Sequence, residues 1–127
     1  MINNKTSKQN NFNLEERTAV FGEKTILFCK TLHINEISRS IITQFIRSST
    51  SVGANYMEAN GADSKKDFIN KISICKKEAK ETCHWLRMLS VIFTDKKSEL
   101  RILWKEAHEL SLIFGAINKK AKQRLIT

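Results

Sequence analysis

The sequence predicts an all-α protein, an up-down-up-down antiparallel four-helix bundle. Its 127 residues include no proline and only four glycines, the two residues on which turns and sheet edges usually depend. Apolar side chains recur at helical spacing in four stretches joined by short links, and no stretch alternates as a strand does. A chain of this length suits one domain with an ordinary core. We therefore expect the bundle over residues 13–124, preceded by a flexible basic arm at residues 1–12.

The first two helices are expected over residues 14–32 and 36–59. Asn13 and Glu16 have the form of a capping box, and Asn35 can cap the second helix. Residues 48–55 are small and polar and have poor helix propensity, so a neighbouring helix should approach closely there. The expected core positions are Leu14, Val20, Phe21, Leu27, Phe28 and Leu32, then Ile37, Ile41, Phe45, Ser48 or Ser49, Val52, Asn55 or Tyr56, and Ala59.

The third helix, expected over residues 65–93 after a capping box at Ser64 and Asp67, has two apolar stripes. The first is a heptad seam that suits a bundle core. It consists of Phe68, Ile72, Cys75, Ala79, Thr82, Leu86, Leu89 and Phe93. The second, on another side of the helix, consists of Ile74, Trp85, Met88 and Ile92.

The second stripe predicts an interface between copies of the chain. One apolar side is enough for a bundle helix, and burial of Trp85 would contribute several kcal/mol at about 25 cal/mol per Å². Because monomers seldom expose such a patch, we expect a closed cyclic homo-oligomer. The alternative is that these side chains meet another helix of the same chain.

The fourth helix is expected over residues 97–122, with Thr94 and Asp95 available as caps. Its expected core stripe consists of Leu100, Leu103, Trp104, Ala107, Leu110, Phe114, Ile117 and Ala121. The links before and after each helix are short, which favours antiparallel neighbours along the chain.

Motifs of catalysis and metal binding are largely missing. Glu81 and His84 form the E-x-x-H element of di-iron bundles, but such sites need a second copy and two further inward glutamates. The sequence therefore predicts no metal and no cofactor. With no nucleophile motif or phosphate loop, and with histidines scattered over three segments, it also predicts that the protein is not an enzyme. A catalytic site assembled only in the folded protein stays open.

The N-terminal sequence and the cysteine spacing indicate the cellular location. The polar N-terminus has no apolar secretory segment, and no run approaches the roughly 20 apolar residues of a membrane span. Cys29, Cys75 and Cys83 are odd in number and lack C-x-x-C spacing, so we interpret them as free thiols. We expect a cytoplasmic protein without membrane contact.

Charge gives the main indication of function. The net charge of +9 arises outside the first two helices, with +3 from residues 61–93 and +4 from residues 94–127. The candidate nucleic-acid-binding residues are Lys66, Lys76, Lys77, Lys80 and Arg87 on the third helix and Lys119, Lys120, Lys122 and Arg124 near the C-terminus. Such clusters neutralise phosphates. The alternative is a solvated basic surface without a ligand. Few aromatics interleave with the lysines, so sequence-specific base stacking is not supported.

Asn55 and Glu58 lie one helical turn apart beside the small, polar part of the second helix. We interpret them as a satisfied polar pair or part of an interhelical network that sets helix register. A ligand site at this place is the alternative.

Several sequence blocks resemble one known family. They are Asn55-Tyr-Met-Glu58-Ala59, Ser64-Lys-Lys-Asp67-Phe68, Lys71-Ile72-Ser-Ile74, and Lys77-Glu78-Ala-Lys-Glu81-Thr82-Cys-His-Trp85-Leu86. Together they resemble the bacterial four-helix bundle family of the protein encoded in intervening sequences of large-subunit ribosomal RNA genes. That family is similar to the accessory protein of diversity-generating retroelements, a basic pentamer that acts with a reverse transcriptase and nucleic acid.

The resemblance implies a homopentamer of four-helix protomers without established biochemical activity. It assigns a structural role to Asn55, Glu58, Glu78 and Glu81. Relatives often have proline where this chain has Gly53, which bears on the kink of the second helix. The predicted function is thus a non-catalytic homo-oligomer that binds nucleic acid without sequence preference, with itself, RNA or DNA, and a reverse transcriptase or other protein as candidate partners. A structural or interaction scaffold without a nucleic-acid ligand is the alternative.

Overall fold

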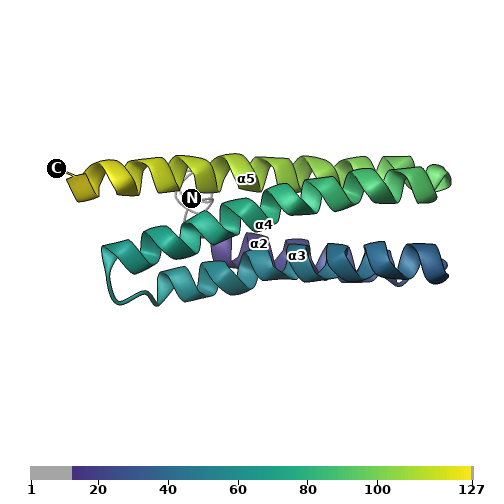
Figure 1. Ribbon diagram of the computed structural model, residues 1–127, viewed down its shortest axis with the longest axis horizontal. Coiled ribbons are helices and arrows are strands. Elements are labelled where there is room, and N and C mark those ends of the chain that lie inside the picture. The colour runs from purple at the N-terminus through teal and green to yellow at the C-terminus, as the bar shows by residue number, and fades with distance from the viewer. Residues whose placement is uncertain (1–12, 127) are drawn as a thin grey trace, which may run out of the picture.

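The computed structural model describes residues 13–126 as an all-α bundle with no strand in that range (Figure 1). In chain order the elements are α2 (Leu14–Cys29), α3 (Glu36–Asn60), α4 (Lys65–Ile92), the short 3₁₀-helix η1 (Thr94–Lys96) and α5 (Lys97–Ile126). The predicted fold class is confirmed. The expected arm at residues 1–12 lies outside the described residues.

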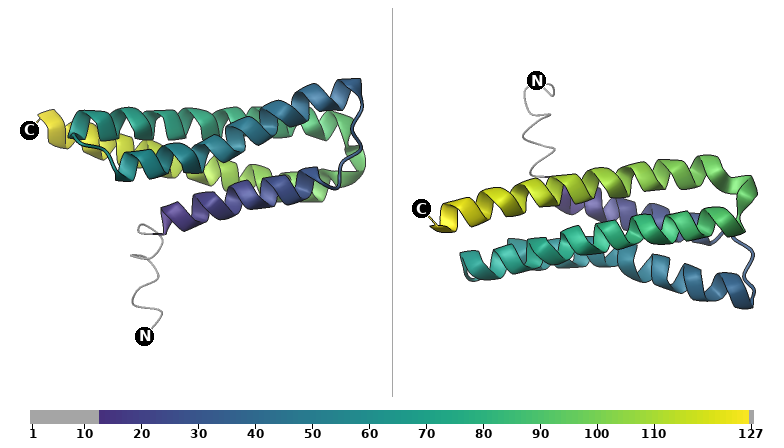
Figure 2. Two further views of the ribbon diagram at one scale, coloured as in Figure 1. Left: turned by 90° about the horizontal axis from the view of Figure 1, so that it is seen from below. Right: turned by 45° about the horizontal axis from the view of Figure 1, so that its top comes forward.

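Helix α4 lies between α3 and α5 and packs along both of them (Figures 1 and 2). Helix α2 packs mainly on α3 and touches α5 over a smaller area. It has 16 residues, against 28 in α4 and 30 in α5. The pair formed by α4 and α5 is therefore the longest continuous helix pair in the molecule.

Helix ends match the expected caps in two of four cases. Asn35 accepts hydrogen bonds from the backbone N–H groups of Ile37 and Ser38, both at 2.9 Å, and the Ser38 hydroxyl accepts one from Asn35 N–H at 2.8 Å. Ser64 accepts from Asp67 N–H at 3.0 Å. The capping box expected at Asn13 is wrong. Its backbone (φ −91°, ψ 16°) is not the extended form that directs an N-cap side chain at the helix, and no side-chain cap bond forms.

The first and last helices end elsewhere than expected, and α5 continues to Ile126 instead of ending at residue 122. The first helix ends at Cys29, three residues early, because Thr31 N–H bonds Phe28 C=O and tightens the last turn. Leu32 is buried beyond that end. At the same end of the bundle, Thr94 and Asp95 form η1 without a side-chain cap, and α5 continues directly from it (Figure 2).

The heptad seam of α4 is the centre of the core, as expected. Ile72, Cys75, Ala79 and Leu89 are all fully buried, and only Phe68 at the start of the seam is partly exposed. Against the seam pack Phe45 and Val52 of α3 and Leu110 and Phe114 of α5. Tyr56 and Phe114 meet across the bundle with ring centroids 5.7 Å apart.

Three expected core residues are exposed instead: Leu27 (61%), Ile37 (72%) and Trp104 (41%). On α2 the buried side consists of Leu14, Thr18, Phe21, Gly22, Thr25, Phe28 and Cys29, and Leu27 lies off it. On α3 the cap residue Ser38 takes the inner position, which turns Ile37 outward. Trp104 faces the side where α4 and α5 meet, described below.

The close approach expected at the middle of the second helix is confirmed. A Cβ atom added at Gly53 would lie 3.2 Å from Thr18 Oγ1 of α2, so a larger residue would push the helices apart. On the opposite side of α3, the hydroxyls of Ser48 and Thr82 are 2.9 Å apart in the interior. Small side chains therefore let α3 approach both α2 and α4 at once.

Candidate nucleic-acid interface

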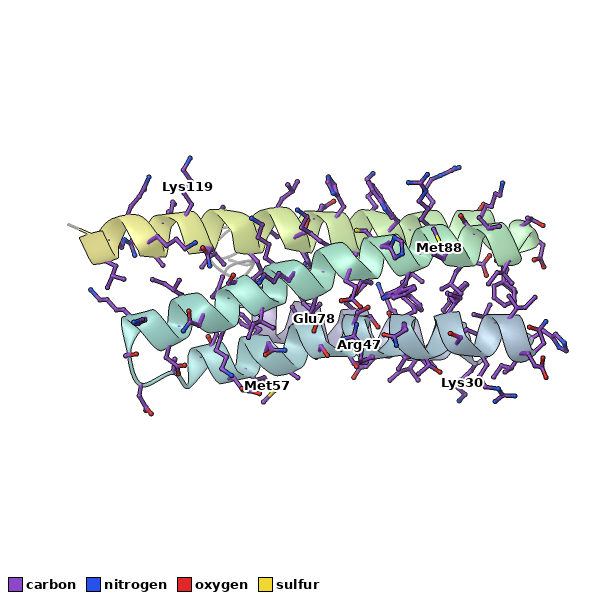
Figure 3. All side chains as sticks on the ribbon, viewed as in Figure 1. Lys30, Arg47, Met57, Glu78, Met88 and Lys119 are labelled. Carbon is purple, nitrogen blue, oxygen red and sulfur yellow. The ribbon has the colours of Figure 1, made fainter. Side chains whose placement is uncertain are left out.

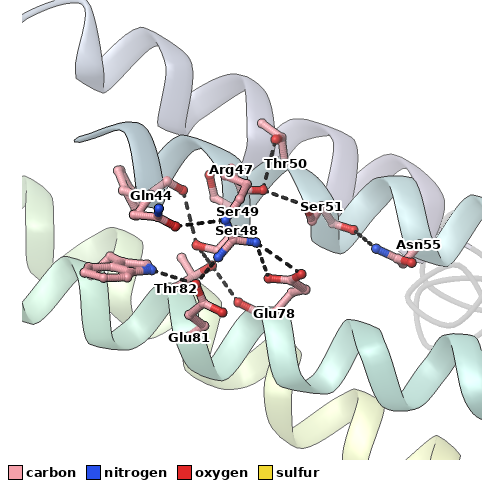
Figure 4. Close-up of polar contacts among 12 residues, drawn as sticks. Gln44, Arg47, Ser48, Ser49, Thr50, Ser51, Asn55, Glu78, Glu81 and Thr82 are labelled. Carbon is pink, nitrogen blue, oxygen red and sulfur yellow. Dashed lines mark hydrogen bonds and ion pairs between the residues drawn. The ribbon is translucent and has the colours of Figure 1, made fainter. Parts of the chain in front are cut away.

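The side of α4 that faces α3 carries Glu78 and Glu81, and both are paired. Arg47 of α3 donates to Glu78 at 3.2 Å and to Glu81, and the Trp85 indole N–H donates to Glu81 at 2.9 Å (Figure 4). Figure 3 shows Arg47 and Glu78 pointing toward one another between the two helices. This side of α4 is tied into the fold by charge pairs.

The two residues expected to set helix register, Asn55 and Glu58, make separate contacts. Glu58 accepts from Lys71 of α4 at 2.6 Å, and this contact raises the pKa of Lys71. Asn55 donates to Ser51 C=O within α3 at 2.9 Å. The two side chains thus bond to different partners.

The side of α4 that faces α5 holds a groove made of two hollows that share Trp104. The first hollow, of about 520 Å³, is lined by Leu86, Arg87, Ser90, Lys97, Leu100, Arg101 and Trp104. The second, of about 550 Å³, is lined by Lys76, Lys80, Cys83, Trp104, His108, Ser111, Leu112, Gly115, Ala116 and Lys119. Below, the α4–α5 groove means these two hollows together.

The α4–α5 groove is strongly cationic. Its described lining residues include six Lys or Arg side chains and no carboxylate: Lys76, Lys80, Arg87, Lys97, Arg101 and Lys119. All six are exposed, and none forms an ion pair within residues 13–126. Unpaired cations along a concave surface create a positive potential that attracts polyanions.

The carboxylates of α5 lie on the other side of that helix. Arg17 of α2 binds Glu106 at 2.8 Å and Glu109 at 3.0 Å, and these contacts, Glu106 first, raise the pKa of Arg17 against the effect of burial. Because they face α2, these two glutamates do not line the groove. Glu106 and Glu109 are therefore engaged with Arg17 and lie away from the groove cations.

Small and aromatic residues shape the groove. The stem of Lys76 crosses α5 at Gly115, where an added Cβ would lie 3.7 Å from Lys76 Cε. Trp104 and His108, one turn apart on α5, stack with ring centroids 4.8 Å apart and planes inclined by 13°. A pair of flat rings therefore stands among the cations.

All nine candidate binding residues are exposed. Four of them, Lys76, Lys80, Arg87 and Lys119, line the α4–α5 groove, and Figure 3 shows Lys119 projecting from α5. The hollows do not include the other five, which are Lys66, Lys77, Lys120, Lys122 and Arg124.

Sequence reasoning missed four lining residues: Lys97, Arg101, Trp104 and His108. A signal for them exists, since 97, 101, 104, 108, 115 and 119 are spaced by 4, 3, 4, 7 and 4 and so share one side of a helix. That the sequence does not support sequence-specific base stacking stays a prediction. That prediction considered aromatics near the lysines along the chain, whereas Trp104 and His108 of α5 line the same hollow as Lys76 and Lys80 of α4.

The second apolar stripe of α4 is half-buried within the protomer. Trp85 and Ile92 pack against the chain's own core, while Ile74 and Met88 are partly exposed and lie outside the core cluster. Burial of Trp85 therefore does not itself require a second copy, which weakens the sequence argument for assembly.

The metal-ligating and thiol side chains in the described part of the chain lie apart or are shielded from solvent. No group of three or more His, Cys, Asp or Glu residues there could hold a metal ion. Burial raises the pKa of Cys29 and of Cys75 to about 12, and that of Cys83 to about 11.

None of the described helices is long and apolar enough to cross a membrane.

Comparison with known proteins identifies a matching family and a similar solved structure. Residues 11–116 match the family model described as 23S rRNA-intervening sequence protein. A solved structure from Bacteroides thetaiotaomicron VPI-5482, of a protein with unknown function from the S23 ribosomal protein family, has a TM-score of 0.75 and 32% identity, over 83% of this chain and 97% of that one. No curated protein matches. Neither match concerns the retroelement accessory protein, so that part of the resemblance stays a prediction.

Proposed function

Since the chain belongs to the 23S rRNA-intervening sequence protein family, we propose that it is a non-catalytic, homo-oligomeric protein that binds nucleic acid in the α4–α5 groove. The binding is largely independent of sequence, because the groove offers charge along its length and few groups that could read base edges. Its expected compartment is the cytoplasm.

The observation that carries this proposal is the charge of the groove lining, with six exposed cations and no carboxylate. Each phosphate neutralised by Lys or Arg releases condensed counterions. With about six contacts, affinity should fall roughly 10³-fold between 50 and 200 mM salt. A steep dependence on salt is therefore the signature of this function.

Two double variants with equal charge change test the location of binding. Lys76→Glu with Lys80→Glu reverses two groove cations, whereas Lys66→Glu with Lys77→Glu reverses two exposed cations of the same helix outside the groove. Fluorescence anisotropy of a labelled RNA at 50 mM salt should show loss of binding for the first pair and a much smaller change for the second. Equal loss in both variants would place binding outside the groove.

The rival function is an interaction scaffold whose positive charge serves solubility alone. Absence of binding to RNA and DNA at 50 mM salt by the wild-type protein would favour it.

Catalysis is a separate class of function. Nuclease activity that needs a divalent metal and disappears in Glu81→Gln or His84→Ala would contradict the non-catalytic proposal.

Assembly into a homo-oligomer, with five copies as the resemblance implies, is supported by apolar side chains left at the surface. Ile74 and Met88 stand half-buried beside the core, and Val91 is 73% exposed on the same helix. Light scattering at micromolar concentration should give a mass several times 14.6 kDa. Met88→Glu should yield folded monomers. A monomeric wild type would sink this part of the proposal.

A further inference from the structure

Trp104 is the one large aromatic side chain of the α4–α5 groove, and it lies where the two hollows meet. Leu103 and Ala107 beside it are buried in the core, whereas Trp104 remains 41% exposed. A tryptophan left this open loses much of the free energy that burial would give, so its position calls for an explanation other than packing.

The Trp104 ring is stacked against the ring of a neighbouring residue. The exposed His108 ring lies nearly parallel to it, with ring centroids 4.8 Å apart and ring planes inclined by 13°. Both residues are on α5, a rigid helix in this region, so the rings need little ordering when a ligand arrives. Together they form a platform of the kind on which a planar base can stack.

The cations are arranged on both sides of this platform. Arg87, Lys97 and Arg101 line the hollow on one side, and Lys76, Lys80 and Lys119 line the hollow on the other. Along α4, Lys76 and Arg87 are eleven residues apart, about 16 Å at 1.5 Å per residue. At about 3.4 Å per stacked nucleotide, the groove spans roughly five nucleotides.

We infer that the α4–α5 groove takes single-stranded nucleic acid, with a base stacked on the Trp104–His108 platform and the flanking phosphates on the six cations. This inference rests on the proposed function and specifies the form of its ligand. In a duplex the base faces are covered by their neighbours, so a side chain reaches one only after unpairing and unstacking. An unpaired strand offers a base face at no such cost.

A second copy of the chain is the main competing occupant. The groove between α2 and α3 is lined by Glu15, Glu16 and Glu23 without any Lys or Arg among its described residues, so its charge is opposite to that of the α4–α5 groove. The exposed rings of Trp104 and His108 favour nucleic acid as the occupant, because charge pairing between two copies of the chain would not involve two stacked rings.

Tryptophan fluorescence can follow the platform directly. The chain has two tryptophans, so Trp85→Phe leaves Trp104 as the sole emitter. At 50 mM salt, a ten-nucleotide oligothymidylate or oligouridylate should quench this emission and bind at least 10-fold more tightly than a ten-base-pair duplex. The reciprocal variant, Trp104→Phe, should bind with little change in the emission of Trp85.

Removal of the ring provides the second measurement. Trp104→Ala should weaken single-strand binding roughly 5- to 150-fold, the loss expected for one base–aromatic stack, and leave duplex binding and the salt slope unchanged. Leu112→Ala is the matched control, because Leu112 is an exposed apolar side chain of the same groove without a ring. Circular dichroism of both variants verifies the helical fold, and Trp104→Phe should retain most of the affinity.

The possible outcomes distinguish this inference from the proposed function on which it rests. Salt-dependent binding that is equal for single strand and duplex, and unchanged in Trp104→Ala, would overturn the inference and keep the proposed function. No binding to either would overturn both. Trp104 emission that shifts with protein concentration, and stays constant with added oligonucleotide, would identify a second copy as the occupant.

Discussion

Helix α4 has two long sides with opposite uses of charge. Toward α3 its carboxylates Glu78 and Glu81 both meet Arg47, and toward α5 its cations Lys76 and Lys80 line an open groove with no carboxylate among the described lining. Between the two sides runs the buried heptad seam. The first set of charges is engaged in joining helices, and the second is available to a ligand. Stability and binding should therefore depend on different sides of one helix.

The largest expected effect concerns two thiols: Cys75 lies in the buried heptad seam of α4, and Cys83 lines the α4–α5 groove. Because burial raises the pKa of Cys83 to about 11 and of Cys75 to about 12, thiolate at pH 8 should be about 100-fold and about 1,000-fold scarcer than in unfolded chain with a pKa near 9. Absorbance after addition of a disulfide reagent should show slow modification, with Cys83 first, that accelerates as pH rises toward 11. Rapid reaction of all three thiols in folded protein would contradict this order.

Breaking the charge pairs on the α3 side should cost the most stability. Arg47→Glu places three carboxylates together, and we expect a loss of about 1–2 kcal/mol, below the value for fully buried pairs because these side chains are partly exposed. Urea unfolding measures it. The control Lys77→Glu makes the same charge change on the outer side of α4 and should leave stability nearly unchanged. An equal loss in both variants would mean that net charge, and not the pairing, matters.

The buried hydroxyl contact between α3 and α4 should have a smaller effect. Ser48→Ala removes one partner of the 2.9 Å contact with Thr82 and should reduce stability by about 1 kcal/mol. Thr82→Val should do the same. If the two hydroxyls act as a pair, the double variant will lose less than the sum of the single losses. Simple additivity in urea unfolding would show that the contact contributes nothing.

The smallest effect on stability is expected on the groove side. Lys76→Glu with Lys80→Glu should change the free energy of unfolding by no more than about 0.5 kcal/mol, because neither cation has a partner to lose within the described chain. The same variant should lose nucleic-acid binding. A large loss of stability would mean that these lysines support the fold, and the contrast between the two sides of α4 would fail.

Helix positions were predictable from the sequence, because they depend on local patterns. The heptad seam from Ile72 to Phe93 and the cap at Asn35 are properties of neighbours a few residues apart. Errors arose where a distant residue decided the outcome. Leu27 is exposed because α2 packs on α3 through its other side, and Trp104 is exposed because it lies where α5 meets α4.

The sequence by itself determined the four-helix architecture, through its hydrophobic periodicity, and the excess of cations in its second half, through its composition. Only the tertiary structure decided which cations act together. Lys76 and Lys119 are 43 residues apart along the chain and line one hollow, whereas Lys77, next to Lys76, does not. The physical reason is that successive helical residues point about 100° apart, so membership of a groove depends on the rotation of each helix against its neighbour, which is fixed by packing of the whole core.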